Sequence, residues 1–170
     1  YSPGDEGEYR DLNVLGFRMD ADLHDNLTFA AQLIAEGSDD YEPEFDWIYA
    51  TIGITPELSL SMGKLRVPVF MYSDYLDVGY AYQWIKPPTV VYNSSQTPFK
   101  TFEGLKLTYT KDIGPLTSEL MVYGGKTEDD FKEQGLDTKL VLDDALGFAW
   151  TLGWEFLTFR TFYMDAVTSA

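Results

Sequence analysis

The sequence contains no cysteine among its 170 residues, which excludes disulfide bonds and thiolate-bound metals. It is also poor in basic residues, with 12 Lys and Arg against 28 Asp and Glu, giving a formal net charge of −16. Because phosphate backbones are bound by clustered Lys and Arg, this balance argues against a nucleic-acid partner. No apolar run approaches the roughly 20 residues of a membrane-spanning helix, so a helical membrane protein is excluded.

The sequence offers few residues that could support catalysis or bind a metal. The single histidine, His24, falls in a predicted turn, where a solvated side chain is a better interpretation than a metal ligand. It supports no Ser/His/Asp set, so we expect no enzyme, no metal site and no cofactor. Three acidic pairs fall in predicted loops and fit a solvated surface better than a divalent-cation site beside lipopolysaccharide: Asp39-Asp40, Asp129-Asp130 and Asp143-Asp144.

What the sequence does contain is alternation. Apolar and polar residues follow one another with a period of two along most of the chain, which is typical of β-strands with unlike faces. The fold class is therefore all-β and antiparallel, in one domain that spans residues 1–170. The predicted strands cover residues 14–23, 27–35, 46–54, 58–65, 102–110, 116–124, 145–154 and 157–166.

The connections between these strands alternate in length. Residues 24–26, 55–57, 111–115 and 155–156 form short turns, whereas residues 36–44, 66–101 and 125–144 form long polar loops. Short turns at one end and long loops at the other are typical of transmembrane up-and-down β-barrels of the outer membrane. The strand lengths also suit a tilted membrane strand better than a typical soluble one. A soluble ligand-binding β-barrel or sandwich, apolar inside, remains the alternative.

Aromatic residues gather near the predicted strand ends, where the interfacial girdles of a membrane barrel belong. Core packing is the other interpretation for each of them. The residues concerned are Trp47, Tyr49, Tyr109, Tyr123, Trp154, Phe156 and Tyr163.

The polar faces of the strands carry charges of both signs, and these predict a water-filled interior because isolated buried charges are costly. Opposed charges across a narrow passage would create a transverse field that selects polar solutes. Alternatively, the same charges pair to hold a loop in place. Lys64 is a weaker member, since alternation places it on the lipid face. The candidate pore-lining and constriction residues are Arg18, Asp20, Asp22, Arg66, Asp74, Asp77, Lys106, Glu119 and Arg160.

The order of turns and loops places both ends of the chain on the long-loop side. Single-chain bacterial barrels start and finish on the short-turn side, so we expect a further strand before residue 14 and more strands after residue 166. The final Thr168-Ser169-Ala170 also lacks the terminal aromatic residue of a whole porin. The chain is therefore expected to be the second to ninth strands of a larger barrel, with 66–101 as its third external loop.

Two stretches in and before this loop resemble the constriction loop of general bacterial porins, in a gammaproteobacterial branch. They are Gly63-Lys64-Leu65-Arg66-Val67-Pro68-Val69-Phe70, and Tyr72 to Tyr80 followed by Trp84-Ile85-Lys86-Pro87-Pro88. The resemblance implies a 16-stranded homotrimeric porin in the Gram-negative outer membrane. It would sit among lipid and lipopolysaccharide, pass small hydrophilic solutes by diffusion, and be constricted by loop 66–101. A closed eight-stranded anchor or adhesin barrel and an 18-stranded porin selective for phosphate or other anions remain alternatives.

Overall fold

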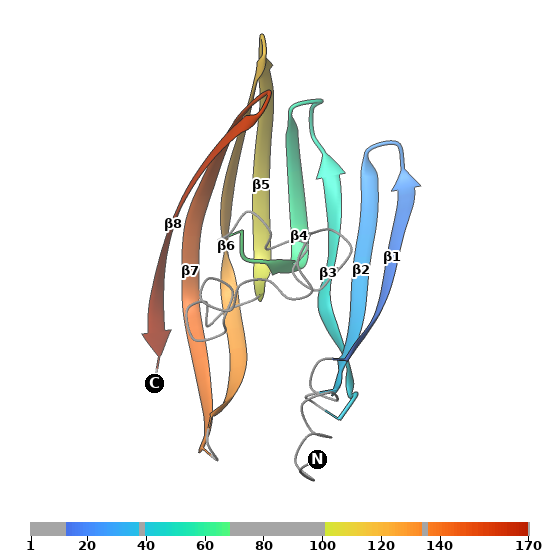
Figure 1. Ribbon diagram of the computed structural model, residues 1–170, viewed down its shortest axis with the longest axis vertical. Coiled ribbons are helices and arrows are strands. Elements are labelled where there is room, and N and C mark those ends of the chain that lie inside the picture. Colours follow the sequence, from blue (N-terminus) through green and yellow to red (C-terminus); the bar gives the residue numbers. More distant parts are fainter. Residues whose placement is uncertain (1–12, 38–39, 69–100, 134–135, 170) are drawn as a thin grey trace, which may run out of the picture.

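The computed structural model describes residues 13–37, 40–68, 101–133 and 136–169, which form eight strands (Figure 1). Each predicted strand is present, so the all-β fold class with eight strands is confirmed. The strands are β1 (Val14–His24), β2 (Leu27–Glu36), β3 (Pro43–Gly53), β4 (Leu58–Arg66), β5 (Thr101–Ile113), β6 (Leu116–Glu133), β7 (Leu136–Trp154) and β8 (Leu157–Ser169).

The strands form one sheet in the order β1-β2-β3-β4-β5-β6-β7-β8, and every neighbouring pair is antiparallel. This up-and-down order is the topology predicted from the alternation. Over the residues that the structure describes, the sheet is open, with β1 and β8 as its two edges (Figure 1).

The short turns lie together at one end of the sheet, at the top of Figure 1. Asp25-Asn26, Gly114-Pro115 and Glu155-Phe156 each separate two paired strands. Gly114 and Glu155 have positive φ values of 63° and 42°, the backbone conformation that tight hairpins need. Strand β1 begins and β8 ends at the opposite end, as the sequence predicted for the described part of the chain.

One predicted loop is wrong. Residues 125–144 do not form a long connection, because β6 and β7 remain paired from Thr127↔Leu142 to Glu133↔Leu136. The two acidic pairs assigned to this loop, Asp129-Asp130 and Asp143-Asp144, therefore lie on strands. Their high charge suggested a loop, but ladder bonds join backbone groups and do not require an apolar face. As a result β6 and β7, at 18 and 19 residues, extend beyond their neighbours (Figure 1).

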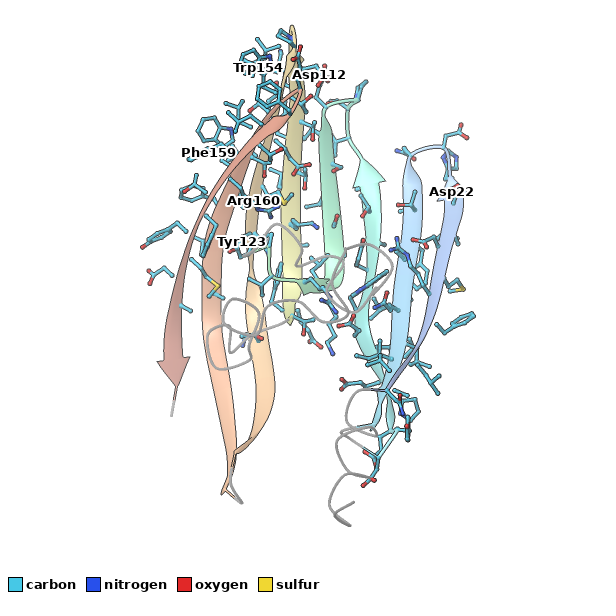
Figure 2. All side chains as sticks on the ribbon, in the orientation of Figure 1. Asp22, Asp112, Tyr123, Trp154, Phe159 and Arg160 are labelled. Carbon is cyan, nitrogen blue, oxygen red and sulfur yellow. The ribbon has the colours of Figure 1, made fainter. Side chains whose placement is uncertain are left out.

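The two faces of the sheet differ in the opposite sense to those of a soluble protein. On one face, here called the outer face, large apolar side chains are exposed, such as Leu105 at 51% and Phe159 at 55%. On the other, the inner face, most side chains are small, polar or buried, such as Ala149 at 1% and Ser61 at 5%, although Phe162 is 45% exposed there. Figure 2 shows this on β8, where Phe159 points away from the sheet and Arg160 lies on the side of Tyr123. In water such an apolar outer face would be unfavourable.

The principal apolar cluster lies on the inner face. It consists of Leu65, Val67, Phe102 and Tyr123, with exposures of 0 to 5%. Tyr49 from β3 and Met164 and Ala166 from β8 pack against it. Side chains from β3, β4, β5, β6 and β8 therefore meet around Val67, which follows β4.

The aromatic positions split between the faces. Tyr109, Trp154 and Tyr163 are exposed on the outer face, and Phe156 is exposed in the β7–β8 turn. Phe159 and Trp150 add to the outer set, their rings edge to face at 6.3 Å. The girdle prediction is wrong for the other three, because Trp47, Tyr49 and Tyr123 lie on the inner face. Alternation already required this, since residues next to the outward Ile48 and Val122 must point inward.

Candidate functional site

The inner face carries the predicted charges in defined groups. Arg18 on β1 donates two hydrogen bonds to the carboxylate of Asp20, at 2.7 and 3.0 Å. Its guanidinium also lies 5.1 Å from the centre of the Trp47 ring. The side chains of Arg18 and Asp20 are 48% and 56% exposed. They therefore form a solvated ion pair on the inner face, in which Arg18 also makes a cation–π contact with Trp47.

A second group is buried. Arg66, the last residue of β4, pairs with Asp46, and these side chains are only 6% and 4% exposed. The amide of Gln32 on β2 donates a further hydrogen bond of 2.9 Å to the same carboxylate. A buried ionised carboxylate requires both a counter-charge and hydrogen bonds. Arg66 and Gln32 supply these to Asp46.

Asp46 was not among the predicted site residues. Alternation counted from Ile48 would place it on the outer face. However, Gln32 pairs with Trp47 and Leu33 pairs with Phe45, so Asp46 is the extra residue of a β-bulge in β3. A bulge re-aims a side chain in this way, and no turn residue or glycine in the sequence signals it.

A third group holds the chain that leaves β4. Arg160 on β8 donates a hydrogen bond of 3.1 Å to the carbonyl oxygen of Pro68, 92 positions away in the sequence. Pro68 is fully buried and Val67 is 5% exposed. The segment Arg66–Pro68 therefore turns onto the inner face instead of continuing along the wall. In Figure 1 it runs from the end of β4 toward β5 and β6.

Lys106 and Glu119 also lie on the inner face. The Lys106 ammonium is 5.8 Å from the centre of the Tyr49 ring. Glu119 lies in one row with Thr151 and Arg160, because Glu119 pairs with Thr151 and Thr151 pairs with Arg160. Charges of opposite sign are thus present at similar height on β6 and β8, with β7 between them.

The remaining predicted residues are separate from these groups. Asp22 pairs with Thr28 next to the β1–β2 turn and is exposed. Asp74 and Asp77, with the rest of the predicted constriction loop up to residue 100, lie outside the described residues. Lys64 is on the outer face, as alternation required, and its Nζ donates a 2.7 Å hydrogen bond to the carbonyl of Phe45.

Within the described part of the chain, no three His, Asp or Glu residues come together as a metal site. None of the described residues belongs to a helix long and apolar enough to cross a membrane. What the described part of the inner face offers chemically is a set of charges, hydroxyls and amides, such as the Thr117 hydroxyl that donates a 2.7 Å hydrogen bond to Asp112.

No known protein family matches the chain, and no curated protein sequence matches it. Among solved structures, the fold is similar to OmpTdeltaL8, a loop L8 deletion mutant of OmpT, an outer membrane protein of Vibrio cholerae. The TM-score is 0.35 at 13% sequence identity, over 90% of this chain and 61% of that chain. The present chain thus spans less than two thirds of the length of that protein.

Proposed function

We propose that this chain is part of the wall of an outer-membrane β-barrel that passes small hydrophilic solutes and ions by diffusion. The observation that carries the proposal is the inverted polarity of the sheet. Large apolar side chains are exposed on the outer face, while the inner face holds Arg18, Lys106, Glu119 and Arg160. Such a sheet suits lipid outside and water inside.

The height of the outer apolar surface supports a membrane location. On β7, Leu146 and Trp154 are separated by eight residue steps, about 27 Å along the strand at ~3.4 Å per residue, and the outward residues between them, Phe148, Trp150 and Leu152, are all apolar. The apolar band of outer-membrane barrels is about 25 Å tall.

A charged row borders this surface on the long-connection side. The next outward residue beyond Leu105 is Glu103, which pairs with Lys64 on β4 and Lys126 on β6. Long basic side chains at such a boundary can reach the headgroup region, where lipopolysaccharide is the proposed neighbour.

The free edges require a larger assembly. Backbone groups of β1 and β8 cannot remain unpaired in hydrocarbon, and in the open sheet (Figure 1) these strands do not pair with each other over the described residues. Further strands of the same polypeptide would satisfy them, as in the 16-stranded, homotrimeric porin that the sequence resemblance implies. A closed eight-stranded anchor would need β1 to pair with β8.

The narrowing of the passage is proposed to begin at the segment Arg66–Pro68, which lies on the inner face. Inner charges of both signs would then order water and favour polar solutes. The proposed activity needs no cofactor and no catalytic residue.

The test is electrical. Full-length protein, purified in detergent and verified as β-rich by circular dichroism, is added to a planar lipid bilayer. Stepwise increases in ion current are expected. Folded protein that inserts without any conductance would contradict the channel proposal and favour a closed anchor barrel, whereas solubility without detergent would favour the soluble barrel.

A further inference from the structure

The residues that directly follow β4 are buried, which is unusual for a connection between two strands. A residue that follows a wall strand in an up-and-down sheet normally enters a solvent-exposed connection. Here Val67 and Pro68 are buried instead, and Val67 packs with Phe102 of β5 and Tyr123 of β6. The segment Arg66–Pro68 is therefore packed against the inner face of the following strands.

Polar contacts at two separate places hold this segment. At its base, Arg66 is tied to the bulge residue Asp46, which also accepts a hydrogen bond from Gln32. At its far end, the carbonyl of Pro68 accepts a hydrogen bond from Arg160. Strand β8 is the fourth strand beyond β4 in the sheet, so the two attachments lie on distant parts of the wall.

Arginine suits the far attachment. Its guanidinium is always charged, reaches far from the backbone and presents several donors in a fixed plane. A hydrogen bond from a charged donor is stronger than one between neutral groups. A carbonyl that points at Arg160 is therefore held more firmly than packing of Val67 alone would hold it.

We propose that Arg160 is a positioning residue: it fixes the segment Arg66–Pro68 across the inner face and so sets the free cross-section of the passage. The part concerning the passage rests on the proposed channel function. The positioning itself does not, and it can be measured without any current.

The absence of native cysteine allows a direct test. In the full-length V67C variant, the introduced thiol is expected to react slowly with a charged, water-soluble methanethiosulfonate reagent, because Val67 is buried. Adding Arg160→Gln is expected to speed labelling about tenfold or more, as a charged hydrogen bond is lost. The matched control is Lys111→Gln, which removes a positive charge from an exposed residue of β5 away from the segment. It should leave the labelling rate unchanged.

Arg160→Lys keeps the charge but shortens the reach and removes the planar fork. It also serves where Arg160→Gln does not fold. Faster labelling of V67C in this background is expected. Labelling as slow as in V67C alone, in either Arg160 variant, would overturn the proposal.

Bilayer recordings separate this inference from the channel proposal. If wild type conducts, Arg160→Gln should increase open-channel current or its fluctuation, and unchanged current would remove the claim about the passage. If folded wild type does not conduct but V67C is protected by Arg160, the channel proposal fails and the positioning role stands.

Discussion

Arg66 at the end of β4 and Asp46 at the bulge of β3 form an ion pair in which neither side chain is more than 6% exposed. The pair of Arg18 and Asp20 joins the same residue types on the same face, but these side chains are 48% and 56% exposed. The chain thus contains a buried and a solvated arginine–aspartate pair that can be compared directly.

Removing the charge of Asp46 should be far more damaging than removing that of Asp20. Asp46→Asn removes the carboxylate that pairs with the buried Arg66 guanidinium, at an expected cost of about 3–5 kcal/mol. Asp20→Asn should cost about 0–1 kcal/mol, because water solvates Arg18. Urea unfolding of the full-length protein in detergent micelles measures both. Equal losses would contradict the structural difference between the pairs.

The ring of Tyr123 covers Gly147 on the neighbouring strand. A Cβ at Gly147 would lie 2.5 Å from Cζ of Tyr123, whereas one at Gly153, on the same strand, would meet nothing closer than 3.9 Å. Gly147→Ala should therefore destabilise the protein by about 1–3 kcal/mol through overpacking. Gly153→Ala, the control, should be neutral or slightly stabilising because glycine weakens a strand interior. A loss at Gly153 as large as at Gly147 would show that backbone effects dominate.

Adjacent residues of β5 test which face meets lipid. Leu107 is exposed on the outer face and Thr108 lies on the inner face. Leu107→Arg should reduce stability in phospholipid bilayers by about 2–4 kcal/mol if it lies near the bilayer centre, while Thr108→Arg should be much milder. Denaturant titration after refolding into vesicles provides the measurement. A soluble barrel with water outside predicts the reverse order.

Tryptophan fluorescence gives a second view of the faces. Trp150 and Trp154 are exposed on the outer face, whereas Trp47 is 4% exposed on the inner face beneath Arg18. In variants that retain a single tryptophan, brominated lipids should quench Trp150 and Trp154 strongly and Trp47 weakly. Strong quenching of Trp47 would mean that the inner face contacts lipid.

Inner charges should set the ion preference of the proposed channel. Lys106→Gln removes a positive charge from the inner face beside Tyr49, so the reversal potential under a salt gradient should shift toward cations. The shift should be largest in dilute salt, since the screening length falls from about 30 Å at 0.01 M to about 3 Å at 1 M. The Lys111→Gln control should have the wild-type reversal potential. An identical value in Lys106→Gln would remove Lys106 from the pore lining.

Strand number and strand order were predictable because they depend on a local property. Alternation between apolar and polar residues repeats every two positions, and it identified all eight strands and assigned Arg18, Lys106 and Arg160 to one face. The prediction for residues 125–144 was wrong because the charge of this stretch was taken as evidence for a loop. Acidic residues there suggested a loop, but the backbone ladder of β6 and β7 continues.

The position of Asp46 marks the limit of reasoning from alternation. Asp46 lies on the inner face only because a bulge inserts one residue opposite Gln32 and Leu33. Trp47, expected at a membrane interface, instead lies beneath Arg18. Strand-end position alone does not determine the face of an aromatic residue, whereas the alternation within its strand does.

The sequence by itself determined an all-β chain with two unlike faces and turns at one end, because these features are encoded within each strand and hairpin. Only the tertiary structure decided which contacts join distant strands. The carbonyl of Pro68 meets Arg160 across 92 positions, and Asp46 meets Arg66 through a bulge. Both contacts depend on the register of several strands and on the path that the chain takes across the inner face, which no local pattern specifies.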